Sequence, residues 1–159
     1  MRPIAVLLGI GVLVAVTSSV LRTLVVPRRL QSKIAHATFL ATLAPFRVVA
    51  RRTSSYVARD KILAWAGPLS IVVTLVVWLL GYLLGYSLLL FGLDDGLNFS
   101  VAVREAGSSL FTLGFASTDR GQLTAVDFLA AATGPVVIGL LIGYLPTIYG
   151  AYNRAWLDR

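Results

Sequence analysis

Hydrophobic positions in this chain gather into long blocks, and polar positions gather between them. Three apolar runs stand out, at residues 4–21, 62–92 and 123–152. A helix rises about 1.5 Å per residue and a bilayer core is about 30 Å thick, so about 20 apolar residues cross it. Each run reaches that length, the first through an extension to Val26. The pattern predicts an all-α membrane protein with three transmembrane helices per chain.

Composition supports this class, because 57% of the 159 residues are hydrophobic and soluble domains are about 45–50% apolar. The chain has no cysteine, which excludes a disulfide framework, a thiolate metal site and a cysteine nucleophile. The single histidine, His36, is assigned no role. The apolar runs hold no pair of carboxylates, and Ser108 and Ser109 have no recognisable base partner. We therefore expect no enzyme, no cofactor and no nucleic-acid partner.

Positive charge gathers between the first two runs. Residues 22–61 hold nine of the 14 Lys and Arg residues, against the single acid Asp60. Apolar residues recur there at helical spacing, which is typical of a basic amphipathic helix on a membrane surface. Residues 27–61 are therefore predicted as a basic cytoplasmic or interfacial segment that contacts the lipid bilayer, with anionic lipids as candidate partners. The lipid-facing candidates are Arg28, Arg29, Lys33, Arg47, Arg51 and Arg52.

The same charge predicts the orientation, since cytoplasmic loops are enriched in Lys and Arg. The N-terminal transmembrane helix, residues 1–26, then starts outside the plasma membrane, and the tail at 153–159 ends in the cytoplasm. A cleaved secretory signal peptide is the alternative for residues 1–26. Its removal would leave the basic segment outside, which counts against it.

Trp78, Tyr82 and Tyr86 repeat every four residues in the second run. Side chains at this spacing share one face of a helix. We interpret the stripe as a helix-packing face rather than as a ligand site.

Between the second and third runs lies a stretch that is too short and too polar to span a membrane, SSLFTLGFASTD from Ser108 to Asp119. Turn residues precede a predicted short helix at 100–111, with Asn98 or Ser100 as its N-cap. An extended segment at 112–116 with a central glycine follows. Non-helical backbone at membrane depth is tolerated where it is buried in protein or lines a water-filled cavity. Its carbonyl oxygens can replace the hydration shell of a cation, and glycine supplies the positive φ that this needs.

The segment Thr112, Leu113, Gly114, Phe115, Ala116 resembles the potassium-channel signature T-V-G-Y-G. Residues 62–152 resemble the two-span pore unit of tetrameric potassium channels. The resemblance implies a homotetramer with an outer helix at 62–92, a re-entrant pore helix at 100–111, a filter strand at 112–116 and an inner helix at 123–152. It implies that the filter carbonyls and the Thr112 hydroxyl line the path of K⁺, the permeant ion.

The resemblance also implies roles for residues around the filter. Acids of the pore helix and the outer mouth are candidates for bracing the filter or attracting cations, namely Glu105, Asp119 and Asp127. Small or kinking residues of the inner helix are candidate gating hinges, namely Gly134, Pro135, Gly139, Gly143 and Pro146.

Departures from the signature leave alternatives open. Ala116 replaces its last glycine and Phe115 lacks the tyrosine hydroxyl, so a non-selective cation channel remains an alternative. Gly114 could instead cap a short external helix, which would make the chain a non-conducting scaffold or accessory subunit. Glu105 could be a solvated charge, and Asp127 could simply pair with Arg120.

Overall fold

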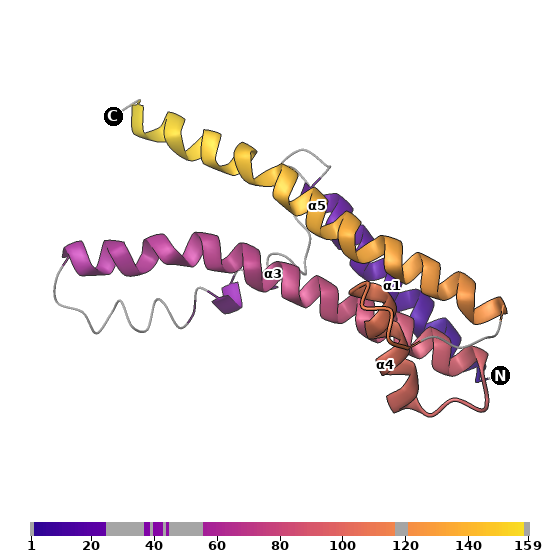
Figure 1. Ribbon diagram of the computed structural model, residues 1–159. Coiled ribbons are helices and arrows are strands. Elements are labelled where there is room, and N and C mark those ends of the chain that lie inside the picture. Colours follow the sequence, from indigo (N-terminus) through magenta and orange to yellow (C-terminus); the bar gives the residue numbers. More distant parts are fainter. Residues whose placement is uncertain are drawn as a thin grey trace. The chain divides into compact units, whose positions relative to one another are not determined.

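The computed structural model describes residues 2–24, 37–38, 40–42, 44, 56–116 and 121–157 (Figure 1). Its principal elements are four helices, and no strand occurs within these described ranges. The all-α class predicted from the sequence is therefore confirmed. The helices are α1 (Pro3–Leu24), α3 (Tyr56–Leu93), α4 (Phe99–Leu110) and α5 (Gly121–Leu157).

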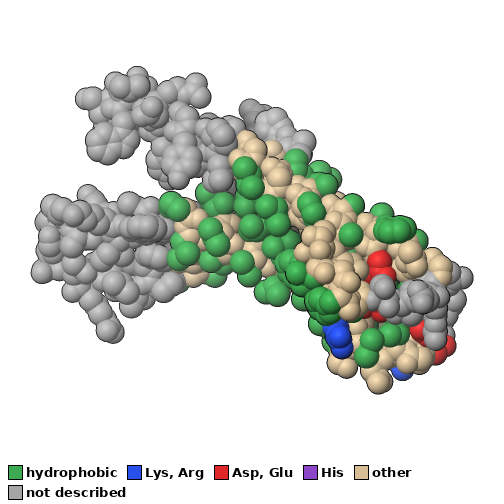
Figure 2. Space-filling view, in the orientation of Figure 1, with side chains coloured by type: hydrophobic (Ala, Val, Ile, Leu, Met, Phe, Trp, Pro, Cys, Tyr) green, Lys and Arg blue, Asp and Glu red, His purple; other side chains and the backbone are tan. Residues whose placement is uncertain are grey.

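Among the described helices, three are long and apolar enough to cross a membrane. The spanning stretches are Pro3–Leu24, Pro68–Leu93 and Leu123–Gly143, with mean hydropathies of 2.5, 2.1 and 2.0. This confirms an integral membrane protein with three candidate spans. Green side chains cover much of the described surface in Figure 2, which fits helices whose outer faces meet lipid.

Two of these helices extend beyond the apolar runs that predicted them. α3 begins at Tyr56 rather than at 62, and α5 continues to Leu157 through most of the predicted tail. Pro135 and Pro146 both lie inside α5, so the helix does not end at either proline. A helix keeps its backbone hydrogen bonds as it leaves the hydrocarbon core. The point where hydropathy falls therefore marks the membrane boundary better than the point where the helix ends.

The chain divides into two compact units, residues 15–81 and residues 1–14 with 82–159. In the first unit, the Trp78 indole nitrogen donates a hydrogen bond to the Ser19 hydroxyl at 3.0 Å. In the second, the Tyr86 hydroxyl lies 2.7 Å from the Thr133 hydroxyl of α5. Trp78, Tyr82 and Tyr86 are all buried, so the aromatic stripe is confirmed as a helix-packing face.

Several predictions fall outside the described residues. They are the lipid-facing Arg28, Arg29, Lys33, Arg47, Arg51 and Arg52, together with His36, Asp119 and Arg120.

Candidate functional site

The short helix α4 begins where the sequence indicates. The Gly96 amide donates to the Asp94 carboxylate at 2.9 Å, which forms the predicted turn. Asn98 occupies the N-cap position in an extended conformation (φ −79°, ψ 148°), and its carbonyl accepts the amides of Val101 and Ala102. Of the two predicted caps, Asn98 is therefore confirmed and Ser100 lies inside the helix. The Asn98 side chain makes no capping hydrogen bond.

α4 packs against α5 and buries one face. Glu105 belongs to that face, and its side chain is only 2% exposed. The alternative in which Glu105 is a solvated surface charge is therefore wrong. The remaining buried members of the face are Ala102, Ala106, Ser108 and Leu110.

Thr112 follows the C-cap of α4 in a left-handed backbone conformation. Its amide donates to the Ser109 carbonyl at 2.9 Å, and the next amide, of Leu113, donates to the Ser108 carbonyl at 2.8 Å. This pair of bonds is the Schellman motif, in which the residue after the C-cap takes a positive φ. Glycine usually fills that position, but Thr112 does so here with φ +53°. A β-branched residue with positive φ is a genuine outlier, so the surrounding bonds must hold it there.

Gly114 also has a positive φ, of +68°. Within the described residues, Thr112 is the one non-glycine with positive φ, so Leu113 and Phe115 have negative φ. The sign of φ therefore alternates from Thr112 through Phe115. Because Phe111 is the C-cap of α4, the alternative in which Gly114 caps this helix is wrong.

Ser108 holds the filter segment, defined as residues 112–116, against the end of α4. Its carbonyl accepts the amides of Leu113 at 2.8 Å and Gly114 at 3.4 Å. Its hydroxyl accepts the amide of Ala116 at 3.0 Å. The Ser108 side chain is 0% exposed, so water does not compete for these bonds. Sequence reasoning did not give Ser108 this role; the available signal was a small hydroxyl residue one helical turn before Thr112.

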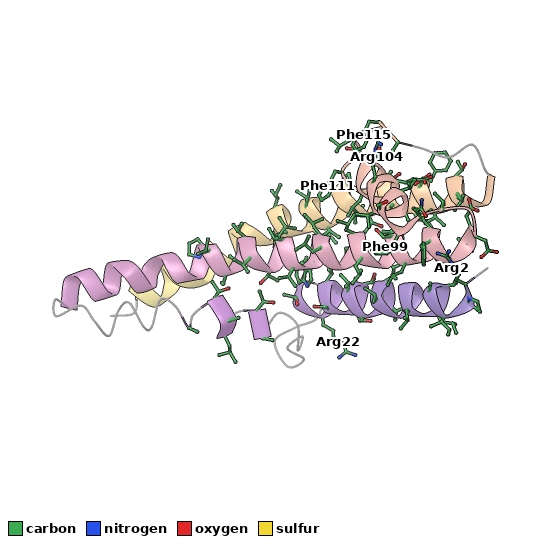
Figure 3. All side chains as sticks on the ribbon, turned by 90° about the horizontal axis from the view of Figure 1, so that it is seen from below. Arg2, Arg22, Phe99, Arg104, Phe111 and Phe115 are labelled. Carbon is green, nitrogen blue, oxygen red and sulfur yellow. The ribbon has the colours of Figure 1, made fainter. Side chains whose placement is uncertain are left out.

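The side chains of this turn point outward. Leu113 is 61% exposed, and Phe111 and Phe115 are also exposed. The Arg104 guanidinium carbon lies 5.5 Å from the centre of the Phe115 ring, and Figure 3 shows the two side chains close together. The Thr112 hydroxyl donates to the Phe111 carbonyl at 2.7 Å. The backbone amides of the turn thus bond back to Ser108 and Ser109 of α4, while its large apolar side chains are exposed.

Two contacts fix the end of α4 on α5. The Ser109 hydroxyl donates to the Asp127 carboxylate at 2.7 Å. A Cβ atom added at Gly134 would overlap the carbonyl oxygen of Leu110. Asp127 therefore has a described partner in α4, and Gly134 is small because a backbone passes directly over it.

The other hinge candidates have different surroundings. A Cβ at Gly139 or Gly143 would meet nothing within 4 Å, and Pro135 is exposed. Pro146 lies in the part of α5 whose backbone alone is described. The structure thus separates Gly134, which is required for packing, from Gly139 and Gly143, which are not required for it within one chain.

The chain matches no protein-family model, no curated protein and no solved structure.

Proposed function

We propose that this chain is one subunit of a homotetrameric cation channel that conducts passively, with K⁺ as the permeant ion. One observation carries the proposal. An exposed segment with alternating φ signs follows a short buried helix and lies between two candidate spans. A ladder of carbonyl ligands requires the backbone to alternate between conformations, some of which need the positive φ that glycine adopts easily. This arrangement supports the resemblance of residues 62–152 to the potassium-channel pore unit.

The chemistry of the segment suits a cation. Carbonyl oxygens of Thr112, Leu113, Gly114 and Phe115 would replace the hydration shell of the ion. The segment starts at the C-terminal end of α4, where the helix dipole is negative and favours positive charge. The three bonds to Ser108 hold the backbone in place before an ion arrives. In this proposal the segment binds ions through its backbone, which explains why its side chains are small or apolar.

One such segment per chain cannot surround an ion, so the proposal requires several copies. Cyclic symmetry closes such an assembly most simply, and the family resemblance implies four copies. The exposed Phe111, Leu113 and Phe115 side chains provide apolar surface for neighbouring copies to cover. We place the assembly in the plasma membrane, with the N-terminus outside and the basic segment at 27–61 on the cytoplasmic lipid surface.

The experiment is a reversal-potential measurement on purified protein in a planar bilayer, with potassium on one side and sodium on the other. Gly114→Ala is the test variant, because a Cβ there meets nothing within 4 Å and only the positive φ opposes it. Such strain costs about 1–2 kcal/mol, so we expect the variant to fold and to lose selective current. Gly11→Ala in α1 is the matched control, since Gly11 also has open space but no positive φ.

The outcomes separate the alternatives. Reversal near the potassium equilibrium potential supports a selective filter despite Ala116. Reversal near zero, with current still sensitive to Gly114→Ala, supports the non-selective cation channel. Absence of current from a chain that chemical cross-linking shows to be monomeric would overturn the channel and favour the scaffold or accessory subunit.

A further inference from the structure

α1 does not belong to the two-span pore pattern, yet its backbone touches that of α3. A Cβ added at Gly9 would lie 2.8 Å from the Gly85 carbonyl oxygen and 2.9 Å from the Leu89 nitrogen. A Cβ added at Gly92 would lie 2.8 Å from the Val6 nitrogen. These neighbours are backbone atoms that cannot turn aside, so a side chain there would require the two helices to shift apart. We call this contact the glycine seam, made by Gly9, Gly85 and Gly92.

The seam has a direction. Gly9 lies against Gly85. Val6, which comes earlier in α1, lies against Gly92, which comes later in α3. The start of α1 therefore runs antiparallel to the end of α3. This brings the N-terminus of the chain to the end of α3 from which α4 departs.

At that end, Arg2 makes two contacts with α3. Its amide donates to the Gly92 carbonyl at 3.0 Å. Its guanidinium carbon lies 3.8 Å from the centre of the Phe91 ring, within the range of a cation–π interaction. The Phe91 ring in turn meets Phe99 edge to face, with centroids 5.6 Å apart and an interplanar angle of 88°. Phe99 is the first residue of α4, and Figure 3 labels both it and Arg2.

The first turn of α4 lacks one common support. Its N-cap residue Asn98 makes no side-chain capping hydrogen bond, so the local bonds there are those of the Asn98 carbonyl and of the Asp94 turn. The other end of α4 is fixed by Ser109, Asp127 and Gly134. The stack of Arg2, Phe91 and Phe99 is a contact that supports the first turn from α1 and α3.

We propose that α1 is a retained positioning helix and that Arg2, through Phe91, fixes the first turn of α4. The proposal rests on the proposed channel only for what the position of α4 controls, because α4 carries the filter segment. Arg2 is a positioning residue, since it acts on α4 through Phe91 and Phe99.

The first experiment tests whether α1 remains in the mature protein and packs on α3. The chain has no cysteine, so an introduced pair is the only possible disulfide. The Val16 Cβ lies 3.8 Å from a Cβ built at Gly81, which suits a disulfide. We expect Val16→Cys with Gly81→Cys to cross-link on mild oxidation of the full chain in membranes, and each single variant to stay unlinked. Loss of residues 1–24 from the purified protein, or a pair that stays reduced, would overturn the proposal.

The second experiment measures amide hydrogen exchange in the first turn of α4, on the full chain in lipid nanodiscs. We expect Arg2→Ala to speed exchange of that turn about fivefold, as loss of a cation–π contact predicts. Arg2→Lys keeps a cation over the ring and should restore most of the protection. Arg22→Ala is the matched control, because Arg22 lies in the last turn of the same helix. We expect no change in α4 for this control.

Exchange in α4 that is unchanged by Arg2→Ala would overturn the role of Arg2. An equal effect of Arg2→Lys and Arg2→Ala would also overturn it, since the charge over Phe91 would then be irrelevant. Neither readout requires ion conduction. A failed bilayer recording therefore counts against the channel alone, and a failed exchange experiment counts against the positioning role alone.

Discussion

The contact of α1 with α3 and the contact of α4 with α5 join helices by different means. At Gly9 and Gly92 of the glycine seam, the two backbones lie so close that an added Cβ would meet backbone atoms. Between α4 and α5, a hydroxyl and a carboxylate are joined by a 2.7 Å hydrogen bond, and Gly134 makes a single close approach beside it. Within the described residues, the hydrogen bonds between α1 and α3 are few, from the Trp78 indole to the Ser19 hydroxyl and from the Arg2 amide to the Gly92 carbonyl. Between α4 and α5, a side-chain hydrogen bond stands beside the close approach.

The difference follows from what each contact does: one joins two regular helices, and the other orients the end of α4. Lipid provides no hydrophobic drive between helices, so two regular helices associate best through small residues and dense packing. The end of α4 is where the chain leaves the helix, and there the orientation of single carbonyl groups matters. Hydrogen bonds fix orientation, which dispersion forces alone do not. The polar bonds therefore gather around Ser108 and Ser109.

The largest loss of stability is expected at Gly134, where a close backbone approach stands beside the Ser109–Asp127 hydrogen bond. Gly134→Ala places a methyl group on the Leu110 carbonyl, and neither backbone can yield without separating α4 from α5. We expect a loss of about 3 kcal/mol, at the upper end of the range for overpacked sites. Gly139→Ala, one turn further along α5, meets nothing within 4 Å and should gain up to about 1 kcal/mol from helix propensity. Thermal melting in detergent, followed by circular dichroism, should give shifts of opposite sign; equal shifts would contradict the packing role of Gly134.

A smaller effect is expected in the glycine seam. Gly9→Ala meets the Gly85 carbonyl and the Leu89 amide, but α1 can shift outward because its opposite face is exposed. We expect a loss of about 1–2 kcal/mol. The matched control is Gly11→Ala, two residues away with open space. The same melting assay distinguishes them, and a seam that tolerates alanine as well as Gly11 does would mean that the helices do not touch there.

The smallest effect is expected for the hydrogen bond between Ser109 and Asp127. Side-chain bonds between membrane helices average about 0.6 kcal/mol in double-mutant cycles. We expect a coupling of this size from Ser109→Ala, Asp127→Asn and the double variant, measured as melting free energies. Additive single effects would show that the bond adds no stability, and that its value lies in orienting the end of α4.

The sequence predicted the helices well because hydropathy and length are sufficient to identify a membrane span. It located the turn before α4 and the aromatic packing face, and it named Asn98 as one of two candidate caps, since each depends on local residue type. It did not predict where α3 begins, because residues 56–61 are helical but precede the apolar run from which the helix was predicted. The Gly81 and Gly85 pair, four residues apart in an apolar run, was a usable signal for close packing. No residue pattern identified α1 as the partner helix.

Around the filter segment, residue type was a poorer guide. Glycine preferences pointed correctly to Gly114 as a positive-φ residue. The same preferences argue against a left-handed threonine, so Thr112 could not be predicted; its conformation depends on bonds to Ser108 and Ser109. Gly134 was predicted as a hinge, and its contact with Leu110 provides a packing reason for the glycine. A hinge and a close backbone approach both favour glycine, so a single sequence does not show which of the two roles Gly134 has.

The antiparallel glycine seam also sets an order of events during synthesis. Chains emerge N-terminus first, so α1 enters the membrane while α3 is still unmade. Until then Gly9 has no α3 backbone to pack against, and Arg2 has no Phe91 ring to contact. Phe91 and Gly92 are among the last residues of α3 to appear. A nascent chain shorter than this cannot form the contact at Gly92, and Phe99 of α4 is synthesised only after Phe91.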